Sequence, residues 1–265
     1  MGIVNLTPDS FSDGGLDGGV LDSLRRCEQL VRQGADLLDL GAESTRPGAT
    51  PLDTATELAR LLPVLKEAVS LGVPVSVDTY KPQVMRAALD LGADLINDIW
   101  ALRWHLPGEP NALEVLARYP RCGVCLMHMH LEPQTMQLAP MQGAVMPAVV
   151  AFLRDRLDAA VANGIDRARV AIDPGIGFGK TVEQNLELLA DQASLLESGA
   201  PLVVGWSRKS SLAGMSAEPT PLAVNERLVP SVVAAVLAVQ RGADVVRVHD
   251  VPETVQALKL LERAR

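Results

Sequence analysis

This sequence has few aromatic residues and no excess of positive charge. Its 265 residues include three Phe, two Tyr and three Trp, and 24 Lys and Arg stand against 32 Asp and Glu, for a formal net charge of −8. Nucleic-acid-binding surfaces typically combine basic patches with aromatic stacking platforms. The composition therefore argues against nucleic acid as a partner.

The sequence also lacks a long hydrophobic run and a cysteine framework. The longest apolar candidate, Val229 to Val239, is shorter than the roughly 18 residues that a membrane span needs, and it contains Pro230. No basic segment precedes an apolar one at the N-terminus, so no secretory signal is visible. Three cysteines, an odd number, do not pair into a framework. We therefore expect a cytoplasmic protein without membrane association, folded as one domain over residues 1–265.

What the sequence does contain is a repeated phrase. Gly-Ala-Asp occurs at residues 34–36, 92–94 and 242–244, each time between a helical pattern and a short apolar run. Glycine commonly ends a helix because it adopts the left-handed conformation easily. Exact and looser copies of this pattern predict eight strands, at Ile3–Leu6, Leu37–Leu40, Val75–Asp78, Leu95–Ile99, Gly123–Met127, Val170–Asp173, Leu202–Gly205 and Val245–Val248. The stretches between them predict helices at Leu21–Gln33, Thr54–Ser70, Pro82–Asp90, Ala112–Tyr119, Val145–Ala162, Val182–Glu197, Val224–Gln240 and Pro252–Arg263.

This alternation predicts the fold class. Apolar strands that alternate with helices are typical of parallel sheets covered on both faces. Eight such units in about 250 residues fit a closed barrel. An open, doubly wound sheet is the alternative, but the sequence has no glycine-rich dinucleotide turn. We predict an α/β protein with a single (β/α)8 TIM-type barrel, a parallel eight-stranded sheet with outer helices.

Polar residues stand at the ends of the predicted strands. In a barrel, the loops that follow the strands build the active-site face. We therefore expect these side chains to converge on one mouth: Asn5, Asp39, Asp78, Asn97, Asp98, His128, Asp173, Arg247 and His249.

The segment from Asp173 to Thr181, DPGIGFGKT, invites comparison with nucleotide-binding loops. A P-loop ending in Gly-Lys-Thr would need glycine at position 174, which is Pro, and a dinucleotide fingerprint starting at Gly175 would need glycine at Lys180. Neither pattern fits. We interpret the segment as a loop whose glycines let the backbone approach a ligand closely.

Cys122 and Cys125, with His128 and His130 nearby, raise the question of a zinc site. Residues three apart on a strand point to opposite faces, so the two thiols cannot chelate one ion together. The second thiol pair of a structural zinc site is also absent. We predict buried thiols without a metal.

Two motifs suit an anionic ligand. Trp206-Ser-Arg-Lys-Ser-Ser211 combines hydroxyls and cations at the possible start of a helix. Arg247 and His249 lie on one face of the last strand, an arrangement suited to a diphosphate. A solvated basic turn is the alternative for the first motif, but its place at a barrel mouth favours binding.

Asp78, Asn97 and Asp173 end the third, fourth and sixth strands. Carboxylate and amide groups can read the N–C–N edge of a planar heterocycle through paired hydrogen bonds. A single Asp at a strand end is often only a helix cap, whereas three such groups facing one cavity indicate a binding site.

The segment Leu228 to Val239 has no polar face. A helix of this kind is either fully buried or part of a subunit contact. We favour the contact.

Taken in order, these motifs resemble those of the dihydropteroate synthases, pterin-binding barrel enzymes of folate biosynthesis that sulfonamides inhibit. The resemblance runs from Met1 almost to the C-terminus. It rests on residues 1–15 (MGIVNLTPDSFSDGG), 43–48 (ESTRPG), 77–79 (VDT), 97–99 (NDI), 127–128 (MH), 173–180 (DPGIGFGK), 207–210 (SRKS) and 247–250 (RVHD). The first and the last three are highly specific.

The resemblance implies a transferase that joins 6-hydroxymethyl-7,8-dihydropterin diphosphate to p-aminobenzoate. The products are 7,8-dihydropteroate and pyrophosphate, Mg²⁺ is the cofactor, and the enzyme is expected to be a homodimer. It implies catalytic roles for Asp78, Lys209, Arg247 and His249. It places the pterin against Asp78, Asn97, Met127, Asp173, Phe178 and Lys209. It places the diphosphate against Asn5, Arg247 and His249, with Asn5 as the metal contact, and p-aminobenzoate against Phe11, Thr45, Arg46 and Ser207.

Two segments depart from the family pattern. Family members usually carry a strand pair before the first barrel strand, whereas Met1 here almost begins that strand. Family sequences tend to continue Met-Gln-Gly after Met127-His128, whereas Met129-His130-Leu131 stands here. We assign no role to His130.

Two rival hypotheses are open at this point. Methyl transfer from methyltetrahydrofolate to a corrinoid protein would use similar strand-end acids, but not the loop at residues 7–15 or the two anion-binding motifs. A noncatalytic pterin-binding paralogue would be expected to have lost Asp173, Lys209, Arg247 or His249, and all four are present.

Overall fold

The structure of the chain, a computed structural model, describes residues 1–6, 15–44, 49–216 and 219–264. Within these ranges, eight short strands alternate with helices along the chain. The strands are β1 (Gly2–Asn5), β2 (Leu38–Gly41), β3 (Val75–Asp78), β4 (Leu95–Asp98), β5 (Gly123–Met127), β6 (Val170–Asp173), β7 (Val203–Val204) and β8 (Val245–Val246).

The strands form one closed, parallel ring. Strands β1 to β6 pair in sequence order, and β7 pairs with β8. Two parallel bridges join these sheets, Ile172 with Leu202 and Gly2 with Val248. The N–H of Ile3 donates to the carbonyl of Val248 at 3.0 Å, which closes the ring beside β1. The predicted barrel is confirmed, and the open doubly wound sheet is excluded.

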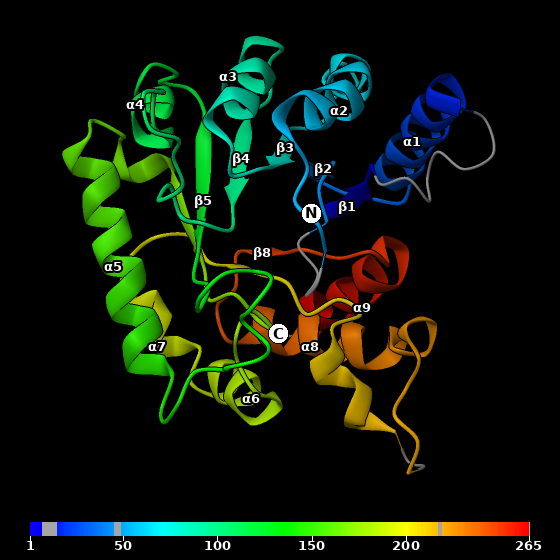
Figure 1. Cartoon of the computed structure of the whole chain (residues 1–265). Helices are drawn as coiled ribbons and strands as arrows, with labels where there is room; N and C mark the ends of the chain where they lie inside the picture. Colours follow the sequence, from blue (N-terminus) through cyan, green and yellow to red (C-terminus); the bar gives the residue numbers. More distant parts are fainter. Residues whose placement is uncertain (7–14, 45–48, 217–218, 265) are drawn as a thin grey trace.

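Helices surround the ring on its outside (Figure 1). They are α1 (Gly15–Arg32), α2 (Thr54–Ala68), α3 (Pro82–Asp90), α4 (Ala112–Ala117), α5 (Met146–Ala162), α6 (Val182–Ala190), α7 (Ala193–Leu196), α8 (Leu228–Gln240) and α9 (Val251–Arg263). Among the described residues, no helix is long and apolar enough to cross a membrane.

Three predicted helix boundaries are wrong. Helix α1 begins at Gly15 rather than Leu21. The single helix predicted over Val182–Glu197 is broken into α6 and α7, where the buried side chain of Gln192 donates to the carbonyl of Ala238 at 2.8 Å. The helix predicted from Val224 begins at Leu228, which places Pro230 in the first turn, where a missing N–H costs no helical hydrogen bond.

The Gly-Ala-Asp repeat has a structural explanation. Gly34, Gly92 and Gly242 have φ values of +97°, +98° and +93°, as expected for glycines that end helices. The acid then caps a neighbouring strand: Asp94 Oδ2 accepts the N–H of Val75 at 2.9 Å, and Asp244 Oδ2 accepts that of Leu202 at 2.8 Å.

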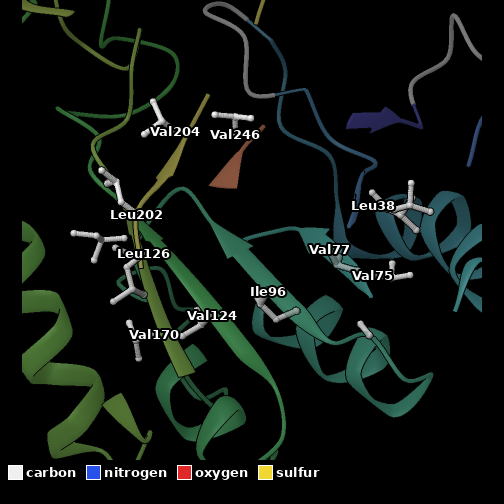
Figure 2. Packing of buried hydrophobic residues seen from close by; sticks show 14 of the residues in the cluster. Leu38, Val75, Val77, Ile96, Val124, Leu126, Val170, Leu202, Val204 and Val246 are labelled. Carbon is white, nitrogen blue, oxygen red and sulfur yellow. The ribbon is translucent and has the colours of Figure 1, made fainter. Parts of the chain in front are cut away.

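The strands have an apolar outer face and a polar inner face. Because side chains alternate along a strand, Leu38, Val77 and Ile96 point to the helices, where they form the core with residues such as Leu126 (Figure 2). Val204 and Val246, paired across β7 and β8, lie side by side in the same layer (Figure 2). The alternate positions carry the inward side chains, among them Asp39, Ser76, Asp78, Asn97, Cys125, Asp173 and Arg247.

The three cysteines are free and buried, which confirms the prediction of buried thiols. Cys122 lies in the turn before β5 and Cys125 lies within that strand. In the described part of the chain, no group of three or more His, Cys, Asp or Glu residues is placed to hold a metal ion.

Candidate active site

The inner faces of neighbouring strands bring four polar side chains into contact. Arg247 donates from Nε to Asp39 Oδ2 at 2.6 Å and from a terminal nitrogen to Asp78 Oδ2 at 2.8 Å. Asn97 Nδ2 donates to the same Asp39 oxygen at 3.3 Å. The predicted convergence of Asp78, Asn97 and Arg247 is therefore observed.

Asn5 lies at the level of these residues. The strand register aligns Asn5 with Gly41, Gly41 with Asp78, and Asp78 with Asn97. A Cβ atom on Gly41 would lie 3.4 Å from that of Asp78, so a larger residue would crowd the site. Asn5 is exposed at the end of β1.

Asp39 was expected at the mouth but was given no specific role, and the structure places it in contact with Arg247 and Asn97. It is fully buried, and its Oδ1 has no hydrogen-bond partner among the described residues. A lone acid in an otherwise apolar strand was the available signal. Its contacts show that it orients both Arg247 and Asn97.

Burial changes the proton affinity of this cluster. Burial raises the pKa of Asp78 to about 7, with Arg247 acting in the opposite direction. Burial lowers the pKa of Arg247, but the carboxylates of Asp39 and Asp78 outweigh this effect and raise it above its ordinary value. The site therefore holds a permanent cation next to Asp78, whose carboxyl group accepts a proton more readily than usual.

A second group of predicted residues surrounds the loop after β6. Asp173 Oδ1 accepts the N–H of Gly175 at 2.7 Å, and burial raises the pKa of Asp173. Lys209 Nζ donates to the carbonyl of Ile176 and lies 4.4 Å from the centre of the Phe178 ring. Burial lowers the pKa of Lys209 to about 8. Met127 and Phe178 belong to the same small hydrophobic cluster, so an apolar wall adjoins these polar groups.

The ends of β7 and β8 meet through Ser207 and His249. Ser207 Oγ lies 3.0 Å from His249 Nδ1 and accepts the N–H of His249 at 3.1 Å. Between Ser207 and Lys209, Arg208 has φ +59° and is ion-paired with Asp250. This pair, which the sequence analysis did not identify, fixes a strained backbone from which Ser207 and Lys209 extend.

A buried ionic network lies behind Asp78. Lys81 is ion-paired with both Glu43 and Glu57, and Thr79 Oγ1 donates to Glu57 at 2.6 Å. Tyr80 donates its hydroxyl proton to Glu43 at 2.9 Å. The network joins the ends of β2 and β3 to α2. No local pattern could reveal it, because its members are far apart in the sequence.

Two residues expected at the mouth are not part of it, and for these the prediction is wrong. Asp98 accepts the N–H groups of Trp100 and Leu102 at 2.8 and 2.7 Å, and His128 lies 2.9 Å from Lys180 Nζ. Both lie one position out of phase with the inward residues of their strands. Phe11, Thr45 and Arg46 lie outside the described residues.

The family model and the known relatives that match this chain agree on one family. Residues 1–249 match the family described as pterin binding enzymes. Dihydropteroate synthase of Neisseria meningitidis serogroup B is 45% identical over 267 aligned residues, which cover 99% of this chain and 91% of the relative.

Solved structures agree with this match. The dihydropteroate synthase of Xanthomonas albilineans with 4-aminobenzoic acid is 46% identical, with a TM-score of 0.90 over 100% of this chain and 92% of that one. The Burkholderia cenocepacia enzyme complexed with 7,8-dihydropteroate is 45% identical, with a TM-score of 0.85 over 100% and 90% of the two chains. Fold, motif order and identity coincide, and the chain belongs to the dihydropteroate synthases, within the pterin-binding enzyme family.

Proposed function

We propose that the two groups of inward residues divide the dihydropteroate synthase reaction between them. Asp78, Asn97, Asp173 and Lys209 hold the dihydropterin ring, with Met127 and Phe178 lining its slot. Arg247, His249 and Asn5 hold the diphosphate. The observation that carries the proposal is the double contact of Arg247 with Asp39 and Asp78, which places a cation beside the acids of the heterocycle pocket.

The pterin assignment follows from hydrogen-bonding capacity. Carboxylates such as Asp173 accept from the N–H groups of an amino-pyrimidine edge, while Asn97 offers both a donor and an acceptor. Lys209 can leave the Ile176 carbonyl for an acceptor on the ring without leaving the Phe178 face. The Burkholderia relative complexed with 7,8-dihydropteroate supports pterin binding by this chain.

The diphosphate end must neutralise charge as the leaving group departs. The C–O bond to the pterin methylene breaks, the amine nitrogen of p-aminobenzoate forms the new C–N bond, and the amine releases a proton. Arg247 and His249 offset the growing negative charge, and Asp78 stabilises the electron-poor methylene.

Mg²⁺ fits this arrangement with Asn5 as its protein contact. Magnesium usually takes one or two oxygen ligands from the protein and others from phosphates and water. The amide oxygen of Asn5 would serve as such a ligand, and the diphosphate and water would supply the others. When bound, the ion would share the negative charge of the leaving group.

We assign Ser207, which lies next to His249, to the p-aminobenzoate side. The same assignment covers Phe11, Thr45 and Arg46, which lie outside the described residues. The Xanthomonas relative with 4-aminobenzoic acid supports this substrate.

Substitution of Asp173 tests the pterin pocket. The Asp173→Asn variant keeps the shape but replaces one acceptor oxygen with a donor. By isothermal titration calorimetry, we expect it to bind the dihydropterin diphosphate at least about a hundredfold more weakly than the wild type, the loss expected for charged hydrogen bonds. Asp191→Asn, at the exposed end of α6, is the control and should bind normally. Unchanged affinity in Asp173→Asn would show that the pocket is wrongly assigned.

We also propose that the enzyme is a homodimer joined through α8. Val229 and Val233 on this helix are 69% and 51% exposed, and no charged residue lies between Leu228 and Gln240. Two adjacent exposed valines, one helical turn apart, form an apolar patch that a second copy can cover.

A further inference from the structure

Residues 174–180, which follow β6, are held by their own chain at most of their carbonyl groups and at several of their N–H groups. Besides Gly175 N–H on Asp173, the contacts are Gly177 N–H to Asn185 Oδ1 at 2.8 Å, Gln137 Nε2 to the Gly177 carbonyl at 2.6 Å, and Met141 N–H to the Gly179 carbonyl at 2.9 Å. A loop held at this many points by side chains and backbone from other segments is typical of a rigid wall.

Lys180 lies inside this wall and is only 3% exposed. Its Nζ lies 2.9 Å from the Gly175 carbonyl, 3.1 Å from the Phe178 carbonyl and 2.9 Å from His128 Nδ1. Three acceptors match the three protons of an ammonium group. The lysine that made the segment look like a phosphate-binding loop therefore points inward and binds the loop itself.

His128 completes this contact as a neutral acceptor. It is buried against Phe152, with ring centres 5.0 Å apart. Burial, and then the charge of Lys180, lowers the pKa of His128 to about 3. The ring therefore stays neutral near neutral pH, and in the tautomer with its proton on Nε2 the Nδ1 atom can accept from Lys180 Nζ.

We infer that Lys180 is a positioning residue for the pterin pocket, acting through the loop carbonyls and His128 rather than through the substrate. It fixes two points of the loop, the carbonyl groups of Gly175 and Phe178. Between them lies Ile176, whose carbonyl holds Lys209 in place. The inference rests on the proposed pterin-binding role of Asp173, Phe178 and Lys209.

Lys180→Met tests the inference, because methionine keeps the length of the side chain without its charge or donors. In calorimetry at pH 6.5, we expect Lys180→Met to bind the dihydropterin diphosphate at least tenfold more weakly than the wild type. The KM for p-aminobenzoate at saturating pterin should stay within twofold. Lys259→Met, on the exposed side of α9, is the control and should match the wild type in both.

A pair of His128 variants covers the case in which Lys180→Met does not fold. Asparagine offers an oxygen near the position of Nδ1, whereas leucine offers no acceptor. We expect His128→Leu to bind the pterin diphosphate at least threefold more weakly than His128→Asn.

Nuclear magnetic resonance of the His128 ring gives a direct signature. The wild-type ring should remain neutral down to about pH 4, and in Lys180→Met it should take up a proton at a higher pH. A folded Lys180→Met with wild-type affinity and an unchanged His128 titration would overturn the inference, as would equal affinities of the two His128 variants if Lys180→Met does not fold. Failure of the wild type to bind the pterin diphosphate would instead overturn the proposed function.

Discussion

Among the described glycines, Gly175 leaves the least room for a side chain. A Cβ atom there would lie 1.8 Å from the carbonyl oxygen of His128, and its φ of +68° is itself unfavourable for other residues. The glycines of this loop are therefore explained by close approach of backbone to backbone as well as by conformation. The sequence predicted close approach to a ligand, and the structure adds this internal contact.

Substituting alanine for Gly175 separates the cost of the left-handed backbone conformation from the cost of the close contact with the His128 carbonyl. Gly72 has φ +81° with no atom within 4 Å of its would-be Cβ, so Gly72→Ala is a matched control that carries only the conformational cost, about 1 to 2 kcal/mol. Gly175→Ala must also displace backbone, and we expect it to lower the free energy of unfolding by about 2 kcal/mol more. Urea unfolding of both variants measures the difference. Equal losses would mean that the contact with His128 relaxes without cost.

At the residue scale, the role of a residue can be predicted from the sequence only where a local sequence pattern shows it. The strand-end positions of Asp78, Asn97 and Arg247 are visible in the sequence, and the structure places them together. The role of Asp39 was missed because a buried acid shows its purpose only through partners on other strands. Lys180 was given no role because the local sequence does not show what its side chain contacts, and only the structure shows its internal acceptors.

At the scale of elements, every predicted strand and helix has an observed counterpart. Apart from the break between α6 and α7, the errors lie at the ends of the elements. Strands β7 and β8 have two residues each rather than four, because the pairing beside them continues only as single bridges and backbone hydrogen bonds. Tertiary contacts decide such boundaries, as Gln192 does between α6 and α7. Local propensity carries no information about those contacts.

The prediction at the scale of elements concerns a dimer contact through helix α8. We expect sedimentation velocity to show a dimer for the wild type and, at the same concentration, mainly monomer for Val233→Glu, since a buried carboxylate at an apolar contact is unfavourable. Val161→Glu is the matched control, because Val161 is also an exposed valine, 43% exposed on α5. A monomeric wild type, or a dimer unaffected by Val233→Glu, would contradict the proposed interface.

At the scale of the whole molecule, the closed ring explains why residues so far apart in the sequence form one site. Asp39 and Arg247 are separated by 208 positions, yet β8 lies beside β1 and β1 beside β2. The alternation of strands and helices was enough to predict this closure, because eight units leave few other arrangements. The extent of the domain, the cytoplasmic location, Mg²⁺ and the dimer stay predictions.

The most direct test of the account is pyrophosphate release from 6-hydroxymethyl-7,8-dihydropterin diphosphate. The assay is run with Mg²⁺, with and without p-aminobenzoate, and in a further sample with the metal removed by a chelator. We predict release that requires both p-aminobenzoate and Mg²⁺, with a product whose mass is that of 7,8-dihydropteroate. Folded protein that binds the pterin diphosphate but forms no dihydropteroate would contradict the account and favour a noncatalytic pterin-binding protein.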